Sequence, residues 1–578
     1  AGGGGPGLGW SAGAGGGLQL TSRLMLEVGA AYTSYAGLHD GITISLGVIS
    51  RVFGPGSVAV PGEIDFETGP RPMPDSIRFS DIELLRVFPA LFKYYDTRPI
   101  GTVTVENTGE DAVENVEVRL MLKQYMDAPK LSARIDELGP GEARDVDLYA
   151  LFTEDILEIT EGARLAAELV AEFAVDGRSG SHSEVVTLES FDRNAMQWDD
   201  DRKVAAFVTA RDEQVQAFAR NVASAIRESR LEAINREFQL AIALLASMDA
   251  HGCTYVIDPS SSYAELSANP LAIDAVQFPR QTLQFRAGDC DDLSVAYAAM
   301  LESVGIPTAF VTVPGHIYLA FGLKMSEREA ARSFSRLDDL ILRDNGTVWI
   351  PVETTILNQG FMKAWATGAQ QWRRYSERGE AGFFPTEDAW SVYEPVAFNV
   401  SKYQVPTPDH DRLIESFHAE LDRFVEREIQ QREQPLVGRL ERSPSNPRTR
   451  NRLGVLYAQF GRIDEAVSHF EVAVSDREYA PALANLGNVA LLRGDLPSAE
   501  EYFGRSIAAD PDNVSALVGI ARVRYDREDF DGAQETFEEI ERIDPEVSRQ
   551  VSYLGRAGAE AGRATDRRSA VDTVFWGD

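Results

Sequence analysis

The chain has 578 residues, which is enough for about three or four domains of ordinary size. Apolar residues make up 44% and charged residues 25%, a composition that excludes a wholly disordered chain. The formal net charge of −34 repels phosphate backbones, so the composition argues against a nucleic-acid partner. No apolar run approaches the roughly 18 residues that a membrane-spanning helix needs.

The first 53 residues combine a glycine-rich lead with an amphipathic β-hairpin. Residues 1–17 are rich in glycine and predict a loop. Apolar and polar residues then alternate from Leu18 to Tyr32 and from Ile42 to Phe53, which predicts two strands around a turn. Such long strands with one apolar face resemble the last hairpin of an outer-membrane β-barrel, which implies outer-membrane association. An ordinary amphipathic hairpin packed on a soluble domain is the alternative.

The next segments are a linker and a β-sandwich. Residues 54–75 contain several prolines and glycines and predict the linker. Short alternating runs separated by turn residues predict five to seven strands over 76–195. Their pattern resembles the immunoglobulin-like (Ig-like) spacer modules of bacterial surface proteins, and no motif in this region indicates chemistry.

The pattern becomes mainly helical near Trp198, at the start of a predicted α+β domain over 196–405. A helical span over 214–247 is expected to break in the charged stretch 227–236. The stretch Gly288–Leu293 then places a cysteine, Cys290, at the start of a helix capped by Asp289. The positive end of a helix favours a thiolate, so we expect an activated thiol.

Two strands follow this helix and carry an imidazole and a carboxylate. His316 begins one strand 26 residues after Cys290, and Glu353 ends another. A thiol, an imidazole and a carboxylate in that order are the parts of a cysteine nucleophile with an oriented base. The other cysteine, Cys253, is interpreted as a packing residue, because a disulfide to Cys290 would consume the nucleophile.

The residues around these three positions carry a family resemblance. The motifs Gly288–Leu293, Pro314–His316 and Trp349–Thr355 resemble those of bacterial transglutaminase-like proteins, which have a papain-like core. The resemblance implies that Cys290 is the nucleophile, His316 the base and then the acid, and Glu353 the orienting group. The family more commonly has aspartate at the third place, so Glu353 departs from the pattern by one methylene group.

The residues around Cys290 also bear on an oxyanion hole and on metal binding. The backbone N–H of Cys290 is one expected oxyanion donor, and among Gln277, Gln281 and Gln284 we favour Gln284 as a second. Asp291 and Asp292 are interpreted as capping or core-bridging carboxylates. No metal-ligand spacing of the CxxC or HxxxH kind is present, and no cofactor or metal is expected.

The C-terminal third contains a repeat. A helical connector over 406–447 leads to a pattern in which Gly454, Ala466 and Phe470 recur as Gly487, Ala499 and Phe503, a period of 33 residues. The pattern, with a weaker third copy, resembles the tetratricopeptide repeat (TPR), which stacks into a solenoid with a concave protein-binding face. We assign it, with a capping helix, to 448–565, followed by a tail over 566–578. An intramolecular brace for the catalytic domain is the alternative role.

These observations predict a multidomain α+β protein: a β-hairpin, an Ig-like β-sandwich, a papain-like or transglutaminase-like core and a C-terminal α-helical TPR solenoid. The expected function is that of a cell-envelope cysteine enzyme acting on protein or peptide amides, by hydrolysis or cross-linking through a thiol acyl-enzyme. The expected location is the periplasm, with outer-membrane association through the hairpin. The alternative is a catalytically inactive transglutaminase-like and TPR scaffold for protein–protein interaction.

Overall fold

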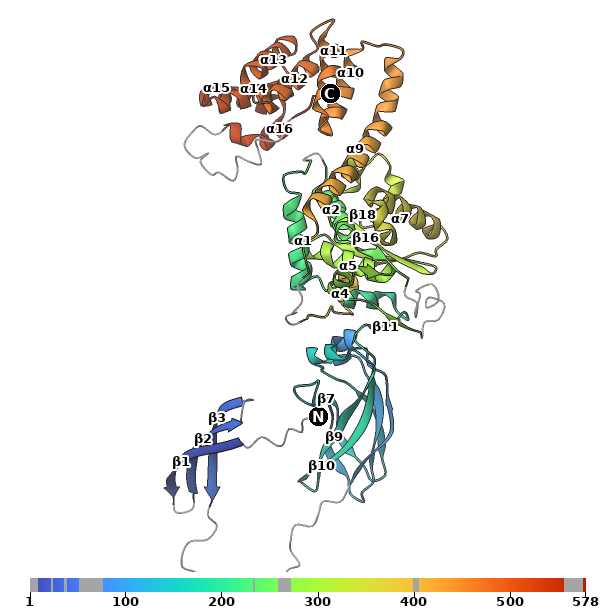
Figure 1. Ribbon diagram of the computed structural model, residues 1–578, viewed down its shortest axis with the longest axis vertical. Coiled ribbons are helices and arrows are strands. Elements are labelled where there is room, and N and C mark those ends of the chain that lie inside the picture. The colour runs from blue at the N-terminus through green and yellow to red at the C-terminus, as the bar shows by residue number, and fades with distance from the viewer. Residues whose placement is uncertain are drawn as a thin grey trace, which may run out of the picture. The chain divides into compact units, whose positions relative to one another are not determined.

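A computed structural model describes residues 9–21, 24–35, 39–50, 76–231, 234–257, 272–398, 405–555 and 575–577 (Figure 1). For the first three ranges only the backbone is described. Contacts divide the chain into two units, residues 1–73 and residues 74–578, and each is described by itself. The linker expected over 54–75 and most of the tail expected over 566–578 lie outside the described residues.

The first unit contains a three-stranded antiparallel sheet in the order β1-β2-β3. Its strands are β1 (Gly9–Thr21), β2 (Leu24–Tyr35) and β3 (His39–Ser50). The expected glycine-rich loop over 1–17 was therefore wrong for Gly9–Gly17, which pairs with the stretch from Tyr35 to Glu27. The expected antiparallel hairpin is formed by β2 and β3, with β1 as an additional strand. Sheet pairing uses backbone N–H and C=O groups, so glycines join a strand when a partner strand lies beside them.

The second unit begins with two antiparallel sheets. A three-stranded sheet has the order β4-β5-β8 and a four-stranded sheet the order β10-β9-β6-β7. These two sheets together contain seven strands, which agrees with the five to seven expected over 76–195. The strands are β4 (Ile77–Leu84), β5 (Gly101–Asn107), β6 (Val113–Met121), β7 (Lys130–Leu138), β8 (Ala143–Leu148), β9 (Ala163–Val175) and β10 (Arg178–Ser190).

A mixed helix and sheet region follows. The expected helical span breaks as predicted, because α1 (Glu213–Ala225) ends before the charged stretch and α2 (Arg236–His251) begins at its last residue. A five-stranded sheet has the order β17-β18-β16-β15-β19. Its strands are β15 (Thr308–Val313), β16 (His316–Leu323), β17 (Ile341–Leu342), β18 (Val348–Val352) and β19 (Gly382–Pro385).

Helices pack against this sheet and hold the candidate site. Helix α5 (Cys290–Ser303) contacts β16, and α7 (Phe361–Ser376) contacts β18 (Figure 1). Trp372 and Tyr375 of α7 pack against the buried side chains of the sheet. Smaller elements of the region are β11 (Ala195–Gln197), β12 (Thr254–Tyr255), β13 (Ile273–Ala275), α4 (Pro279–Phe285), β14 (Ala287–Gly288), α6 (Glu327–Ser333) and α8 (Thr386–Trp390).

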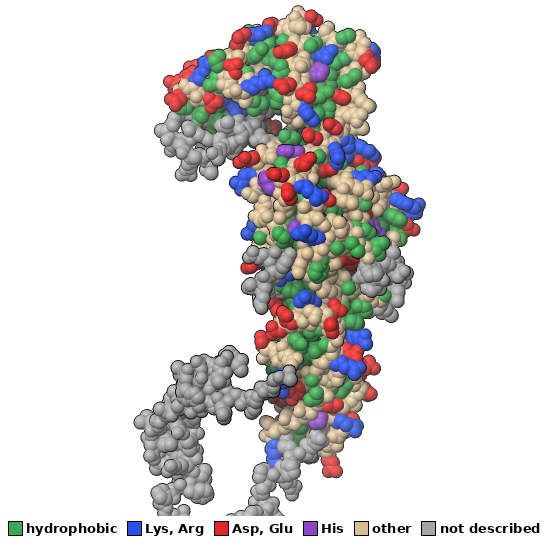
Figure 2. All heavy atoms as spheres, viewed as in Figure 1, with side chains coloured by type: hydrophobic (Ala, Val, Ile, Leu, Met, Phe, Trp, Pro, Cys, Tyr) green, Lys and Arg blue, Asp and Glu red, His purple; other side chains and the backbone are tan. Residues whose placement is uncertain are grey.

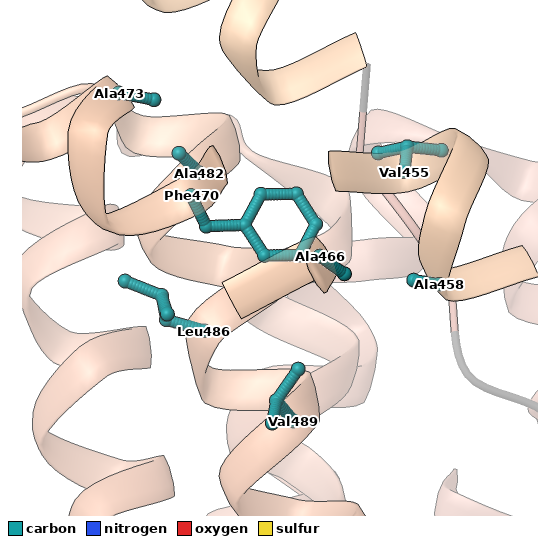
Figure 3. Packing of buried hydrophobic residues seen from close by; sticks show 8 residues of the cluster. All are labelled: Val455, Ala458, Ala466, Phe470, Ala473, Ala482, Leu486 and Val489. Carbon is teal, nitrogen blue, oxygen red and sulfur yellow. The ribbon is translucent and has the colours of Figure 1, made fainter. Parts of the chain in front are cut away.

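The C-terminal third is helical. A long helix, α9 (His410–Leu440), contacts both α2 and the first repeat helix. Antiparallel helix pairs then follow, and Phe470 packs between small residues of neighbouring helices (Figure 3). The helices are α10 (Pro447–Gln459), α11 (Ile463–Val474), α12 (Ala480–Leu492), α13 (Leu496–Ala509), α14 (Val514–Asp526), α15 (Phe530–Ile543) and α16 (Pro545–Gln550).

Two properties concern the surface. Among the described residues, none of the helices is both long and apolar enough to cross a membrane. On the face drawn in Figure 2, acidic and basic side chains are interspersed rather than gathered in one basic patch. The expectation, drawn from the net charge, that a polyanion is a poor partner stays a prediction.

Candidate active site

The start of α5 is a tightly bonded turn. The Asp289 side chain accepts from the backbone N–H of Asp292, and the Asp292 carboxylate accepts in return from the N–H of Asp289 at 3.2 Å. A Cβ atom on Gly288 would lie 2.6 Å from the Asp292 Cβ, so only glycine fits before this cap. These contacts hold Cys290 at the first position of the helix, as the sequence predicted.

The Cys290 thiol is 5% exposed, and the helix that it begins contacts β16. The backbone N–H donors of Ile317, in β16, and of Asp291 act to lower the pKa of the thiol. Burial nevertheless raises the pKa of the Cys290 thiol. The charges of Asp289 and Glu353 raise it further, by more than the two backbone donors lower it. The expectation that the helix terminus leaves a thiolate here was wrong in its net direction, because burial and two carboxylates outweigh it.

His316 and Glu353 meet through the pairing of β16 with β18. The two strands are antiparallel, with Leu319 opposite Val352, so the beginning of β16 lies near the end of β18. His316 Nε2 lies 2.6 Å from Glu353 Oε2. Because Nε2 bonds the carboxylate, Nδ1 is the ring nitrogen left for a second partner. The structure therefore brings the predicted imidazole and carboxylate together.

Glu353 is held by more than the imidazole. The other oxygen, Oε1, accepts from the backbone N–H of Thr355 at 3.1 Å and from its hydroxyl at 2.6 Å. Gln371 Nε2 donates to Oε2 at 3.0 Å. Burial acts to raise the pKa of Glu353, but the bonds and charge from His316 and the bonds from Thr355 outweigh it, so the pKa is lowered. A glutamate thus remains ionised in a buried position and reaches the imidazole.

The helix and the carboxylate strand are also joined directly. Ser294 Oγ donates to the Cys290 carbonyl at 2.6 Å and lies 2.8 Å from Thr354 Oγ1. Thr354 follows Glu353 in sequence, and all four of these residues are buried. This bridge ties the turn that carries the thiol to the turn that carries the carboxylate, which limits how far the two can separate.

The three glutamines considered for the oxyanion hole lie in different surroundings. Gln284 is exposed on α4. Gln281 bonds Asn194 and the backbone N–H of Phe278, which is a structural role. Gln277 lies nearest to the start of α5, because its backbone N–H donates to Asp292 Oδ1 at 2.6 Å. The oxyanion role of Gln284 stays a prediction.

The remaining carboxylates and the second thiol match simple roles. Asp292 bridges the helix cap to Gln277, as expected of a capping and bridging residue. Cys253 and Cys290 are both free thiols. Cys253 is buried, and burial raises its pKa to about 12, which agrees with its interpretation as a packing residue.

Two residues near the site were missed from the sequence. Gln371 on α7 was missed because only the packing of α7 on the sheet brings it to Glu353. Tyr255 was missed because it reaches the site through a two-residue parallel pairing of β12 with β14, in which it lies opposite Gly288. Burial raises the pKa of the Tyr255 hydroxyl, and the charges of Cys290 and Asp289 add to the shift, although the residue is 41% exposed. No local sequence pattern predicts either contact.

One group of side chains at the site could hold a metal ion. Ligand atoms of Asp289, Cys290 and Asp291 lie within 4.8 Å of one another. Among the described residues, this is the one set of three such side chains close enough to share a metal ion. Burial raises the pKa of the Asp291 carboxyl well above its ordinary range, and the neighbouring Asp289 adds to the shift. A cation that binds this group must therefore first displace the proton that the Asp291 carboxyl holds.

Comparison with protein families identifies the C-terminal region. Two tetratricopeptide repeat models match residues 451–514 and residues 490–555. The predicted TPR repeats are confirmed, and such repeats form surfaces for protein–protein interaction. No curated protein matches the chain.

Solved structures with similar repeats cover a limited part of the chain. A tetratricopeptide repeat protein from Parabacteroides merdae is 17% identical, with 23% of this chain and 55% of that chain covered and a TM-score of 0.20. MamA is 21% identical over 27% of this chain and 82% of its own, with a TM-score of 0.19. YrrB, described as a TPR protein with an unusual peptide-binding site, is 18% identical over 28% and 77%, with a TM-score of 0.18.

Proposed function

We propose that residues 196–405 form a transglutaminase-like cysteine enzyme that acts on protein or peptide amides, with Cys290 as nucleophile. The observation that carries the proposal is the 2.6 Å bond between His316 Nε2 and the buried Glu353 carboxylate, at the strand end beside the Cys290 thiol. An ionised carboxylate fixes the ring orientation and stabilises the imidazolium that forms when the ring takes a proton.

In the proposed reaction the Cys290 proton moves to His316 Nδ1 as the sulfur forms a bond to the amide carbonyl carbon. The carbon–nitrogen bond then breaks, and the imidazolium gives its proton to the leaving amine, which leaves a thioester. Water or a second amine attacks the thioester, with His316 accepting the proton from it and returning one to the sulfur. Hydrolysis gives a carboxylic acid and aminolysis gives a new amide.

The raised pKa of the thiol fits a mechanism in which the sulfur carries its proton at rest. Proton transfer is then coupled to substrate binding, which displaces water and brings the carbonyl to the sulfur. The backbone N–H of Cys290 is the oxyanion donor in this proposal, with Gln284 as the predicted second donor. The substrate is a polypeptide and no cofactor takes part.

A thiol-reactive chloromethyl ketone or iodoacetamide, read by mass spectrometry, tests the proposal. We expect Cys290 to be labelled much faster than Cys253, because only Cys290 is paired with a base in this proposal. Cys253 is the internal reference thiol. His316→Ala should abolish the difference, since the base is then missing. Equal and slow labelling of both thiols in the unaltered chain would sink the enzyme hypothesis.

The second candidate function is a catalytically inactive scaffold in which the TPR repeats bind proteins. The specific observation in its favour is that the Cys290 thiol is only 5% exposed and has a raised pKa. The two candidates differ in one readout, since a scaffold forms no covalent adduct with a peptide amide or ester. An acyl adduct on Cys290, trapped at low pH and detected by mass spectrometry, would exclude the inactive scaffold.

The location and the flanking domains belong to the same proposal. We place the protein in a bacterial cell envelope, with residues 76–195 as an Ig-like spacer between an outer-membrane-associated N-terminal hairpin region and the enzyme. The strands in residues 9–50 and the two antiparallel sheets of 76–195 support this arrangement. Recovery of the full chain in a soluble cytoplasmic fraction would contradict the location.

A further inference from the structure

The last described residues of the chain lie against the first helices of the TPR repeats. Phe575, Trp576 and Gly577 are half-buried there, although residues 556–574 before them lie outside the described part of the chain. Four polar side chains contact the backbone of this tail: Asn451 on α10, Asn485 and Asn488 on α12, and Ser515 on α14. We call these four residues the asparagine row.

The asparagine row bonds both polar groups of one backbone unit. Asn451 Nδ2 and Asn485 Nδ2 each donate to the Gly577 carbonyl at 2.8 Å, and Asn485 Oδ1 accepts from the Gly577 N–H at 2.8 Å. A side-chain amide that donates to a carbonyl and accepts from the N–H of the same residue reproduces the pairing of a β-strand. Such contacts recognise main chain, whatever the side chains of the ligand are.

A second backbone unit is bonded one step along. Asn488 Nδ2 donates to the Phe575 carbonyl at 2.8 Å, and Ser515 Oγ donates to the same oxygen. With the tail in place, Asn451 and Asn485 are 0% exposed and Asn488 is 3% exposed. Buried amides are costly without partners, and the tail backbone supplies partners at each of these three asparagines.

The side chains of the tail add selectivity. Trp576 packs against the cluster around Phe470, and the two rings are nearly parallel with centroids 6.3 Å apart. Phe575 packs against a second cluster, which contains Leu517, Ile540 and Leu554. Gly577 is different, because a Cβ placed on it would meet no atom closer than 3.6 Å. The site therefore selects the two aromatic side chains and tolerates a larger residue at the third position.

We propose that the asparagine row is a main-chain peptide-binding site that the chain fills with its own residues Phe575–Gly577, and that a protein with an exposed Phe-Trp segment binds there by displacing this tail. The tail is tethered, so it competes at an effective concentration on the order of 1 mM. If the site binds the tail sequence with a dissociation constant of about 10 μM, the tethered tail weakens the apparent affinity for a free peptide by about 100-fold. The proposal is independent of the chemistry at Cys290.

The test measures the anisotropy of a fluorescein-labelled peptide with the sequence of residues 573–578. We expect it to bind a chain that ends at Gly555 about 100-fold more tightly than it binds the full chain. The full-length double variant Phe575→Ala, Trp576→Ala should bind like the shortened chain, which excludes a folding effect of the truncation. Equal affinity for the full chain and for both altered chains, or no binding to either altered chain, would overturn the proposal.

Matched variants locate the site. In the shortened chain, Asn485→Asp keeps the acceptor for the ligand N–H but loses the donor, and we expect affinity to fall at least 10-fold. Glu501→Gln, exposed on α13, should leave affinity unchanged. A peptide with alanine in place of the tryptophan should not bind, whereas alanine in place of the glycine should bind normally. If either peptide behaves in the opposite way, the assigned selectivity is wrong.

Sedimentation of the full chain tests whether the tail binds within one molecule. We expect a monomer at all concentrations, with and without residues 575–578. A dimer that dissociates when those residues are removed would overturn binding within the same chain and assign the row to the tail of a second copy.

Discussion

Glu353 shows how several partners fix the position of one buried carboxylate. Its Oε2 lies 2.6 Å from His316 Nε2. Thr355 and Gln371 hold the remaining bonds of the carboxylate, so its position is set by three partners instead of one. The position of the carboxylate therefore depends on its surroundings as well as on its length.

Replacing Glu353 by glutamine tests its role as an orienting charge. The amide keeps a similar shape but loses the charge that stabilises the imidazolium, so we expect the rate of Cys290 alkylation to fall by about 100-fold. Time courses of iodoacetamide labelling with peptide mass spectrometry measure the rate. Glu387→Gln, exposed on α8, is the matched control and should react normally. An unchanged rate in the Glu353 variant would remove that residue from the mechanism.

The raised pKa of Asp291 predicts how the free energy of unfolding depends on pH. Burial and the nearby Asp289 raise its folded-state pKa well above the unfolded value of about 4. The folded chain therefore holds a proton that the unfolded chain has released, and this group lowers the free energy of unfolding as pH rises above about 4. Asp291→Asn resembles the protonated form, so urea midpoints of the variant should fall less between pH 5 and pH 8. An identical slope in both chains would contradict the assignment, and Asp136→Asn, an exposed site, should keep the original slope.

Among the elements, the TPR helix pairs depend on small residues at their contacts. A Cβ on Gly454 would lie 2.3 Å from Phe470 Cε1, and one on Gly487 would lie 2.6 Å from Phe503 Cε1. Both glycines recur at the same place in the repeat, and each lets the ring of the partner helix reach its backbone. Figure 3 shows the ring of Phe470 among the buried side chains of its cluster. A Cβ on Gly504 of α13 would meet no atom of the described residues within 4 Å, so no packing contact requires glycine there.

Alanine at these glycines should therefore act in opposite directions. Gly454→Ala and Gly487→Ala force α10 from α11 and α12 from α13, and we expect each to cost about 1–3 kcal/mol in the repeats. Gly504→Ala adds helix propensity without a clash and should stabilise α13 by about 0.5–1 kcal/mol. Hydrogen exchange of the repeat helices in the full chain measures both effects. Loss of protection in the Gly504 variant, or none in the other two, would contradict the packing argument.

At the scale of the whole molecule, the division of contacts separates residues 1–73 from residues 74–578. The candidate active site and the asparagine row both lie in the second unit, so the residues that carry each proposal belong to the longer part of the chain. The described residues of the first unit form three paired strands, and none of the residues named for either site belongs to them.

A chain that starts at Pro74 tests this independence. We expect its thermal unfolding midpoint and the labelling rate of Cys290 to match those of the full chain within the error of the measurement, because no predicted site residue is removed. If the first unit associates with a membrane, the shortened chain should also lose any need for detergent. A large fall in the unfolding midpoint would show that the two units stabilise each other.

Local patterns in the sequence determined much of the second unit. The cap at Asp289, the break between α1 and α2, and the period of the TPR repeats depend on residues close in sequence, or on many positions that recur at one spacing. Close helix packing was also predictable, because small residues recur where the helices meet. Such signals need no knowledge of distant partners, which is why they could be read from residue order alone.

Only the tertiary structure decided the contacts made between distant segments. The strand formed by Gly9–Thr21 exists because β2 lies beside it, Gln371 and Tyr255 reach the site through long-range packing, and the thiol pKa rises because the fold buries it next to carboxylates. The seating of Phe575–Gly577 on the asparagine row is of the same kind, since Asn451 lies 126 residues before Gly577. The sequence by itself determined which groups were available, and the folded chain decided which of them meet, because burial and pairing depend on neighbours that residue order does not name.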